Sequence, residues 1–511
     1  MAQFRDLPHF RDLRAFLDHL DNRKQLLHVA EPVSTVHETT EVHRRVLKSG
    51  GPALIFERAT CADGSSAQMP MLVNLFGTLE RVAWGLGVER QRLGALGDLL
   101  ASLRDPGPVS GLKGALERWP LVRAAFATVP AIVTNPPAQQ DVRVGADADL
   151  LRLPIQTCWP DEAGPLITWP LVITRPPDRD DALHYNMGVY RMQILGRDRA
   201  IVRWLAHRGG AAHHRLWAAE RQAMPVAVAI GTDPATMISA VLPLPERMSE
   251  LLFSGILRGE RPRLSRCATI PMMAPADAEI VIEGYVSAQE TAPEGPFGDH
   301  TGYYNAVETF PVLHVTAITT RSAPIYISTF TGRPPDEPSI IGEALNELFV
   351  PLLRRQIPEI VDCWFPPDAC SYRMAVVSIR KRYPGQARRV MMALWGMLAQ
   401  FSYTKLIVVV DDDIDVRDWR DISWVLATRM DPSRDLMLTE RTPIDYLDFA
   451  SPLPGLGGKL GIDATSKIGS ETSREWGRVL AMDAGVCRRI DGLWERLGIE
   501  IGNSSSPGAA Q

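Results

Sequence analysis

The sequence predicts a mixed α+β protein in which two α/β domains flank a mainly antiparallel β domain. Its 511 residues are enough for about three domains of typical size. Helix-like and strand-like segments alternate near both ends of the chain, which is typical of α/β domains. Between them, short β-like runs recur between Gly and Pro turns, which is typical of an antiparallel sheet or barrel. We expect the domains to span residues 1–130, 131–332 and 333–511.

The first domain is expected to open with an amphipathic helix. Leu13, Phe16, Leu17 and Leu20 recur at the i, i+3, i+4, i+7 spacing that places them on one helical face. The apolar runs that follow predict the other elements of this domain, which are a helix at 35–48 and strands at 26–29, 53–56 and 71–74.

The same patterns predict the elements of the second and third domains. The β-like runs of the second domain lie at 171–174, 188–194, 200–205, 226–231, 279–283 and 312–320. In the third domain we expect helices near 341–349 and 388–401 and a strand near 374–379. The strand at 406–410 is apolar throughout, which favours a place in the middle of a parallel sheet.

Composition excludes several classes of protein. The six cysteines are scattered without a CxxC pair, which disfavours a disulfide framework or a zinc ribbon and fits a reducing compartment. A net charge of −5 and the lack of a basic aromatic stretch argue against a nucleic-acid partner. Met1 to Arg14 carry charges at short intervals, unlike a secretory signal, and the run 406–410 is too short to span a bilayer. We expect a cytoplasmic protein, and leave weak contact with a membrane surface open.

Three residue clusters in the second domain could carry chemistry. The cluster at 290–304 contains Glu294 and Asp299 within a segment rich in Gly and Pro, which predicts a rigid irregular loop. Two carboxyl groups held near an arginine can have their pKa values pushed apart, which gives one ion and one proton donor. A solvent-exposed acidic turn is the alternative, and is the commoner role of such a segment taken alone.

The cluster at 186–193 offers an arginine and an asparagine. Arg191 has the planar fork that suits a carboxylate, either of a substrate or of Glu294, and Asn186 offers an oxygen to Mg²⁺ or Mn²⁺. A structural salt bridge and a turn asparagine are the alternatives. In a regular strand the two side chains would point to opposite faces. Both can serve one site only if Gly188 allows a bulge or if a ligand lies across the strand edge.

The cluster at 203–210 could bind a phosphate. Arg203 and Arg208 supply charge, and Gly209 and Gly210 allow close backbone approach. The histidines in and after this cluster would suit zinc, but they lack an HExxH motif or a cysteine set, so structural roles are the commoner interpretation; they are His207, His213 and His214.

Other motifs are absent or weak. Residues 411–413 are three aspartates after a buried strand, where α/β proteins often bind ligands, but a strand-ending loop is the favoured interpretation. The sequence has no GxxxxGK[ST], no GxGxxG after a strand and no GxSxG. Nucleotide kinases, dehydrogenases and serine hydrolases are therefore disfavoured.

Taken together, the three clusters resemble the UbiD family of reversible carboxy-lyases. Further matching segments occur in the same order along the chain, from about residue 8 to 495: they are 158–160 (CWP) with 165–169 (PLITW), 331–338 (TGRPPDEP), 442–452 (TPIDYLDFASP) and 459–465 (KLGIDAT). The resemblance is strongest to the bacterial 3-polyprenyl-4-hydroxybenzoate decarboxylases.

The resemblance implies a cofactor and a set of site residues. Members of the family bind prenylated FMN beside a divalent metal, usually manganese, often with potassium nearby. Asn186 and Glu250 would hold the metal, which bridges to the cofactor phosphate. Arg191, Glu294 and Asp299 would form the acid/base network, with Asp299 as the proton donor. The residues implied to contact the flavin are Val189, Tyr190, Arg191, Arg203, Trp204, Leu205, Arg208 and Gly209. Two roles stay open: His213 as a further metal ligand, and Lys459 as a phosphate or oligomer contact.

The resemblance also implies a fold, partners and a reaction. The expected fold is an N-terminal α/β domain, a split β-barrel that carries the flavin and a C-terminal α/β domain that makes the contacts of a dimer or hexamer. The expected reaction removes CO2 from a 3-polyprenyl-4-hydroxybenzoate to give a 2-polyprenylphenol in ubiquinone synthesis, with a flavin prenyltransferase supplying the cofactor. Loss of CO2 leaves negative charge on a ring carbon, and a cofactor can take up that charge whereas no side chain can. Another aromatic or α,β-unsaturated acid as substrate, or a non-catalytic role in a quinone-synthesis assembly, remain alternatives.

Overall fold

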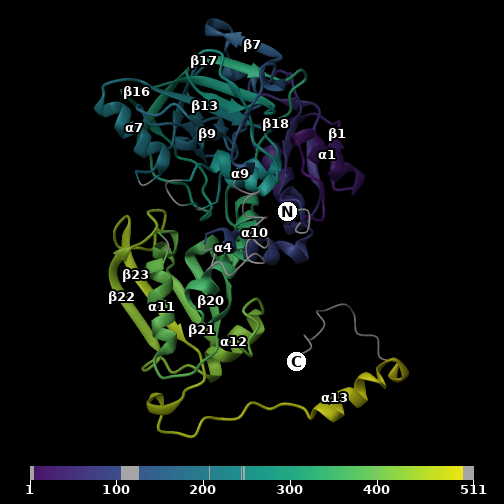
Figure 1. The fold of residues 1–511 in the computed structure, drawn as a ribbon, viewed down its shortest axis with the longest axis vertical. Helices are drawn as coiled ribbons and strands as arrows, with labels where there is room; N and C mark the ends of the chain where they lie inside the picture. The colour runs from purple at the N-terminus through teal and green to yellow at the C-terminus, as the bar shows by residue number, and fades with distance from the viewer. Residues whose placement is uncertain are drawn as a thin grey trace, which may run out of the picture.

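The structure is a computed structural model that describes residues 5–104, 126–206, 208–242, 244, 248–397 and 399–498. His207 and the first four residues of the charged N-terminal segment lie outside the described residues. The chain forms an upper body, made of the N-terminal and central regions, and a lower body made of the C-terminal region (Figure 1). It then leaves the lower body as an extended arm that carries α13 (Ala484–Asp491).

The N-terminal region contains a small sheet in the order β1-β3-β5-β18, whose last strand comes from the central region. Helix α1 begins after Asp12, whose side chain accepts a hydrogen bond from the Ala15 N–H, and it buries the four predicted apolar residues. The elements are α1 (Leu13–Asn22), α2 (Glu38–Lys48), α3 (Leu79–Gly85), α4 (Leu93–Arg104), β1 (Leu26–Val29), β2 (Val33–Ser34), β3 (Ala53–Phe56), β4 (Ala59–Thr60) and β5 (Met71–Val73). Helix α2 begins later than the expected residue 35 because the backbone before it is paired elsewhere: the Thr35 N–H donates to the Thr60 carbonyl and the His37 N–H to the Thr157 carbonyl.

The central region is an antiparallel sheet that curls into a half-barrel, as the sequence predicted. Its strands follow the order β10-β9-β13-β16-β17-β12-β11-β8, with β7 beside β17. The elements are β6 (Ala131–Ile132), β7 (Asp141–Val144), β8 (Leu166–Ile167), β9 (Leu171–Thr174), β10 (Asn186–Val189), β11 (Met192–Ile194), β12 (Arg199–Val202), α7 (Gly209–Ala219), β13 (Met224–Ile230), α8 (Pro234–Ser239), α9 (Glu250–Arg258), β14 (Arg263–Arg266), β15 (Met273–Pro275), β16 (Ile280–Glu294), β17 (Glu308–Thr320) and β18 (Tyr326–Ile327).

Two central strands differ most from the expectation. The strand expected at 279–283 continues to Glu294, because register shifts after Glu283 and Val286 let the pairing with β17 continue past irregular positions. The strand expected at 188–194 is two strands, β10 and β11, which lie near opposite ends of the sheet order. The chain between them therefore crosses the open side of the half-barrel.

The C-terminal region contains a sheet in the order β19-β20-β21-β23-β22. Strand β21 pairs in parallel with β20 on one side and β23 on the other, which confirms the predicted central place of the run 406–410. The elements are α10 (Glu337–Gln356), β19 (Ile360–Trp364), β20 (Met374–Ile379), α11 (Gln386–Met397), β21 (Leu406–Asp411), α12 (Trp419–Thr428), β22 (Leu436–Pro443), β23 (Leu456–Asp463) and α13.

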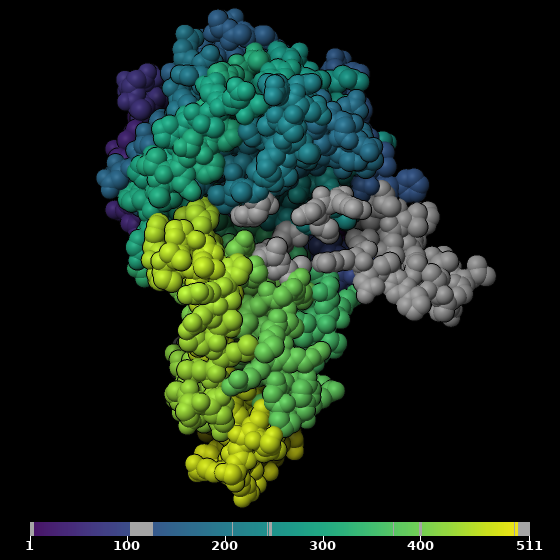
Figure 2. Space-filling model, turned by 90° about the vertical axis from the view of Figure 1, so that its left-hand side faces the viewer, coloured from purple at the N-terminus to yellow at the C-terminus, as the bar shows by residue number. Residues whose placement is uncertain are grey.

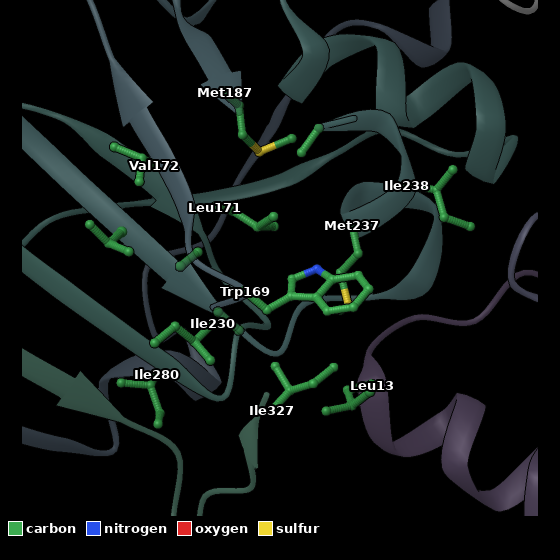
Figure 3. Close-up of a cluster of buried hydrophobic side chains, with 14 of the residues drawn as sticks. Leu13, Trp169, Leu171, Val172, Met187, Ile230, Met237, Ile238, Ile280 and Ile327 are labelled. Carbon is green, nitrogen blue, oxygen red and sulfur yellow. The ribbon is translucent and has the colours of Figure 1, made fainter. Parts of the chain in front are cut away.

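One hydrophobic cluster joins the N-terminal region to the half-barrel. Leu13 of α1 lies beside Ile327 and Trp169 in this cluster (Figure 3). The C-terminal sheet has clusters of its own on its two faces. Helix α10 belongs to both bodies, because Leu348 packs in the first cluster and Leu353 in one of the C-terminal clusters.

Candidate functional site

The crossing between β10 and β11 places Arg191 at the centre of a network of charged groups. Tyr190 and Arg191 lie between the two strands and belong to neither. Gly188 pairs regularly with Val172, so no bulge forms there. The expected conflict between the directions of Asn186 and Arg191 is resolved instead by the break in the strand, which frees Arg191 from the alternation of side chains.

Glu294, the last residue of β16, accepts hydrogen bonds from two arginines. Its Oε1 lies 2.8 Å from Arg191 Nε, and its Oε2 lies 3.2 Å from Arg191 Nη2 and 2.5 Å from Arg203 Nη1. The Glu294 side chain is fully buried. A carboxylate in such a place needs charged donors to offset its lost hydration, and the two guanidinium groups supply them.

The loop after β16 brings Asp299 to the same arginine. Asp299 Oδ2 lies 3.3 Å from Arg191 Nη1. Asn305 fixes the loop, because its Oδ1 accepts from both Arg191 Nη2 at 2.8 Å and the Phe297 N–H at 2.9 Å. Gln193 Oε1 accepts from the Gly295 N–H at 2.9 Å. The structure thus brings together the three residues expected to form the acid/base network.

His300 is the second partner of Asp299. Asp299 Oδ1 accepts from the His300 backbone N–H at 2.7 Å and faces its Nδ1 at 2.5 Å. Burial would raise the pKa of Asp299, but the hydrogen bonds and charge of His300, with the charge of Arg191, lower it to about 2. Burial would lower the pKa of His300, but the hydrogen bond and charge of Asp299 raise it. In this arrangement Asp299 is the ion and the imidazole carries the proton.

The C-terminal region contributes a side chain to the network. Arg203 Nη2 donates to Tyr446 Oη at 2.9 Å and to Glu308 Oε2 at 2.8 Å. Tyr446 lies in the loop between β22 and β23, at the end of the lower body that faces the half-barrel (Figure 1). The rings of Phe449, from the same loop, and Tyr303 lie 5.9 Å apart. The two bodies therefore meet at the site.

Sequence reasoning missed four residues of this site: Gln193, His300, Asn305 and Tyr446. His300 and Gln193 lie within the clusters that the sequence singled out, and Tyr446 lies in the segment 442–452 that carried part of the resemblance. Their neighbourhood was a signal, but their contacts depend on how the loops fold back on the barrel.

Glu250, the first residue of α9, reaches the start of β10, where Asn186 is the first residue. Glu250 Oε2 accepts from the Met187 N–H at 2.9 Å, and Asn186 Nδ2 donates to Tyr190 Oη at 3.3 Å. Burial raises the pKa of Glu250 to about 7, although the backbone N–H bond opposes this. A nearby cation would favour the ionised form of this carboxyl group.

The chemistry of these donors fits a hard divalent cation. An amide oxygen and a carboxylate are ligands that Mg²⁺ and Mn²⁺ accept. Thr174, the register partner of Asn186, has its hydroxyl 2.9 Å from His213 Nδ1, so the His213 ring lies in the same neighbourhood. Burial lowers the pKa of His213 to about 4, which keeps the ring neutral. Among the described residues no group of three or more His, Cys, Asp or Glu side chains could hold a metal, so a cation here needs further oxygens, such as those of a phosphate.

The residues expected to contact a flavin surround this place. The Tyr190 and Trp204 rings meet edge-on at 6.5 Å, and Trp204 Nε1 is buried without a hydrogen-bond partner. Arg208 is the N-cap of α7, whose first residues are Gly209 and Gly210, so backbone N–H groups and a guanidinium are available to an anion. A Cβ at Gly209 would collide with Asn186 Oδ1, and one at Gly210 with Trp204 Nε1. Val189 is half-buried in the same hydrophobic cluster as Tyr190 and Trp204, whereas Leu205 packs in another cluster, with Phe310 and Val312. This cradle fits a planar ring system that ends in a phosphate.

Other candidates serve the structure. His214 Nε2 lies 3.0 Å from the Ser287 carbonyl oxygen, and Asp411 and Asp413 pair with Arg429. Lys459 Nζ donates to the carbonyls of Ser402 and Pro443 in the C-terminal region. The structure therefore does not bring Lys459 to the half-barrel cradle. No helix among the described residues is both long enough and apolar enough to cross a membrane.

Family models cover most of the chain. Residues 17–100, 131–334 and 339–464 match the N-terminal, Rift-related and C-terminal domains of 3-octaprenyl-4-hydroxybenzoate carboxy-lyase. The fold and the site thus define an enzyme of the carboxy-lyase class, a decarboxylase. The chain belongs to the UbiD family.

Solved structures agree with this assignment over almost the full length. The closed form of vanillic acid decarboxylase from Sedimentibacter hydroxybenzoicus is 25% identical with a TM-score of 0.81, and the match covers 96% of this chain and 99% of that one. The UbiD-class enzyme HmfF from Pelotomaculum thermopropionicum, in complex with FMN, is 27% identical with a TM-score of 0.76, covering 93% and 98%. An evolved dimeric form of HmfF in complex with prFMN is 26% identical with a TM-score of 0.74, covering 94% and 98%.

Proposed function

We propose that the protein is a prenylated-FMN-dependent decarboxylase that converts a 3-polyprenyl-4-hydroxybenzoate to a 2-polyprenylphenol and CO2 in ubiquinone synthesis. The observation that carries the proposal is the contact of Arg191 with both Glu294 and Asp299, beside a cradle that fits a flavin phosphate. The HmfF complexes with FMN and prFMN support the choice of cofactor.

The cradle divides the binding tasks among its residues. Arg208 and the first N–H groups of α7 would hold the cofactor phosphate, and Tyr190 with Trp204 would line the ring. Asn186 and Glu250 would hold a divalent metal such as Mn²⁺ against that phosphate, with K⁺ as a further counter-ion. The metal's task is to neutralise and position the phosphate.

The acid network serves the proton balance of the reaction. An aromatic carboxylate that loses CO2 keeps the electron pair of the broken carbon–carbon bond, and the ring carbon must then take one proton. The cofactor, when bound, supplies a place for that electron pair. Arg191 orients Asp299, and Asp299 in its protonated form would deliver the proton, while Glu294 holds Arg191 in place.

Decarboxylation of another aromatic acid is the second candidate function. The supporting observation is the likeness to a vanillic acid decarboxylase at a TM-score of 0.81. A prenylated and a small phenolic acid would both present a carboxylate to Arg191. Side chains outside the acid network would therefore determine the specificity between them.

The test is an assay of the full chain co-expressed with a flavin prenyltransferase, supplied with Mn²⁺ and K⁺. We expect a flavin-like absorption spectrum and release of CO2 from a 3-polyprenyl-4-hydroxybenzoate. Asp299→Asn should keep the spectrum and lose turnover by about 100-fold or more, as removal of a general acid does. The matched control is Asp63→Asn, an exposed aspartate of the N-terminal region, which should keep both. Turnover of vanillic acid alone would select the second function, and absence of a flavin spectrum would sink both.

We also propose the division into domains at residues 1–130, 131–332 and 333–511 and a homo-oligomer. The arm supports the oligomer, because Leu480 and Met482 on it are 98% and 71% exposed. Covering such apolar side chains with a second copy of the chain is favourable, because it removes them from water.

A cytoplasmic site of action, with peripheral contact with a membrane face, would suit a polyprenylated substrate.

A further inference from the structure

Asp299 contacts His300 through one of its carboxylate oxygens and Arg191 through the other. One carboxylate oxygen, Asp299 Oδ1, contacts two nitrogens of His300: the backbone N at 2.7 Å and the ring Nδ1 at 2.5 Å. The other oxygen, Oδ2, is left to Arg191. The imidazole thus meets the carboxylate at a separate atom from the one that the arginine positions.

The ring of His300 links the buried carboxylate to solvent. Its side chain is 24% exposed, against 13% for Asp299. No described residue forms a hydrogen bond with its Nε2. The side chain is thus partly open to solvent, while its Nδ1 faces Asp299.

Charged groups from three elements surround this ring. Asp299 is on its own loop, Asp445 and Arg373 come from the C-terminal region, and Asp336 precedes α10. Asp299 and Asp445 raise the pKa of His300 and Arg373 lowers it, and the attraction of the carboxylates prevails over burial. The resting pair therefore holds one proton, on the ring.

The proposed reaction consumes one proton for each CO2 released, and an ionised Asp299 cannot deliver it. We infer that His300 stores this proton and transfers it from Nδ1 to Asp299 Oδ1, so that Asp299 becomes the acid that protonates the ring carbon. After turnover Asp299 is a carboxylate again, and the neutral ring of His300, which has kept its Nε2 proton, regains a proton from solvent at Nδ1. One proton enters from solvent and one leaves in the product, with no change of oxidation state. This inference rests on the proposed function and adds a proton-storing residue to it.

The first experiment follows the His300 ring itself and needs no cofactor or substrate. The full chain, labelled with ¹³C at the histidine ring Cε1, is titrated by NMR, and the signal of His300 is identified by its loss in His300→Asn. We expect a pKa above the ordinary value for histidine, and a lower pKa in Asp299→Asn, because the ring then loses the charge that holds its proton. A His300 pKa at or below the ordinary value and unmoved by Asp299→Asn would overturn the inference.

The second experiment separates proton storage from loop support. His300→Asn keeps a hydrogen-bond donor near the position of Nδ1 but cannot carry a proton. In the cofactor-loaded enzyme it should lower kcat by about 10- to 100-fold and leave KM and the flavin spectrum unchanged. The wild-type kcat should fall as pH rises through the pKa of His300, because the ring then loses its proton, and this pH dependence should vanish in the variant.

The matched control is His28→Gln, which breaks another Nδ1–carboxylate pair, with Glu57 at 3.0 Å, in the N-terminal region. It should leave kcat and its pH dependence unchanged. Wild-type kcat and pH dependence in His300→Asn would overturn the inference while leaving the proposed function intact. If the loaded wild-type enzyme releases no CO2 from any acid tested, the proposed function fails, and the NMR titration still decides whether the pair holds a proton.

Discussion

Glu294 shows at the scale of one residue how the site tolerates buried charge. Its two oxygens accept three N–H donors from Arg191 and Arg203, and no part of the side chain is exposed. A charge in such a place is stable only while its partners remain, because water cannot replace them.

Glu294→Gln should therefore cost far more stability than the loss of an exposed partner. We expect the free energy of unfolding to fall by about 3–5 kcal/mol, because the two guanidinium groups lose their shared counter-ion. Glu308→Gln is the control, since Glu308 pairs with the same Arg203 but is 44% exposed, and its loss should cost less than about 1 kcal/mol. Urea unfolding of the cofactor-free chain measures both, and equal losses would contradict the account.

Glu250→Gln tests the candidate metal ligand. The amide keeps the size of the carboxyl group but loses the charge that a divalent cation requires, so Mn²⁺ affinity should fall by at least about tenfold. Glu260→Gln, an exposed carboxyl just beyond the end of the same helix, should leave the affinity unchanged. Calorimetric titration with Mn²⁺ in the presence of FMN measures the difference, and equal affinities would remove Glu250 from the metal site.

Local patterns predicted single residues well where neighbours in sequence decide the outcome. The four apolar residues of α1 are buried as their spacing indicated. Asn305 and Tyr446 could not be found in this way, because each acts on an arginine more than 100 positions away in the chain. The periodicity of a sequence does not reveal contacts between residues that are so far apart in the chain.

At the scale of elements, strand pairing was the feature that the sequence concealed. The run 188–194 has the composition of one strand, yet Val189 pairs with β9 and Met192 with β8 and β12. The closure of the half-barrel decides this break, and closure depends on every strand at once. By contrast, the apolar run 406–410 needed only its own composition to reveal a buried parallel strand.

Helix α10 carries a second buried acid whose environment has a measurable consequence. Glu337 Oε1 accepts from the Phe76 N–H at 2.7 Å, and Oε2 lies 3.4 Å from His43 Nε2. Burial raises the pKa of Glu337 to about 7, against the opposing hydrogen bonds and the charge of Arg81. Burial and Arg81 lower the pKa of His43 to about 3, so the imidazole stays neutral and offers the acid no counter-charge.

This environment predicts how stability depends on pH. Because the folded pKa of Glu337 exceeds its unfolded value, its contribution is fully present below the unfolded value and is lost as pH rises through about 7. Relative to Glu337→Gln, the wild type should lose about 1–3 kcal/mol of unfolding free energy between about pH 5 and pH 8. Glu80→Gln, on a half-exposed residue of α3, should change stability equally at both pH values. Urea unfolding at the two pH values decides, and a constant difference for Glu337→Gln would refute the prediction.

At the scale of the whole molecule, the site lies where the upper and lower bodies meet. In Figure 2 the yellow-green part of the C-terminal region reaches the teal central region, and the contact of Tyr446 with Arg203 crosses this junction. The division into three domains, with oligomer contacts assigned to the C-terminal one, stays a prediction. The sequence did not show that the C-terminal region supplies a side chain to the acid network, since that depends on how the bodies dock.

The arm beyond β23 predicts a change of oligomeric state. Leu480→Asp with Met482→Asp places charges on the exposed apolar part of the arm, which should weaken its burial against a second copy. We expect a smaller particle by light scattering after size exclusion, with an unchanged circular dichroism spectrum. Arg478→Asp with Arg474→Asp changes the charge of the same segment without touching its apolar side chains, and should keep the particle size. The proposal of an arm-mediated oligomer fails if the apolar double variant keeps its size.

Helix α10 gives the molecule a mechanical property that neither body has alone. Its first half closes the cluster of the upper body and its second half closes one cluster of the lower body, without a break at the boundary. A helix forms and unfolds cooperatively. Heat or force that unfolds one half of α10 therefore also weakens the packing of the hydrophobic cluster at its other half. The two bodies are thus coupled through one helix. A substitution in α10 that lies far from the acid network can therefore still destabilise that network.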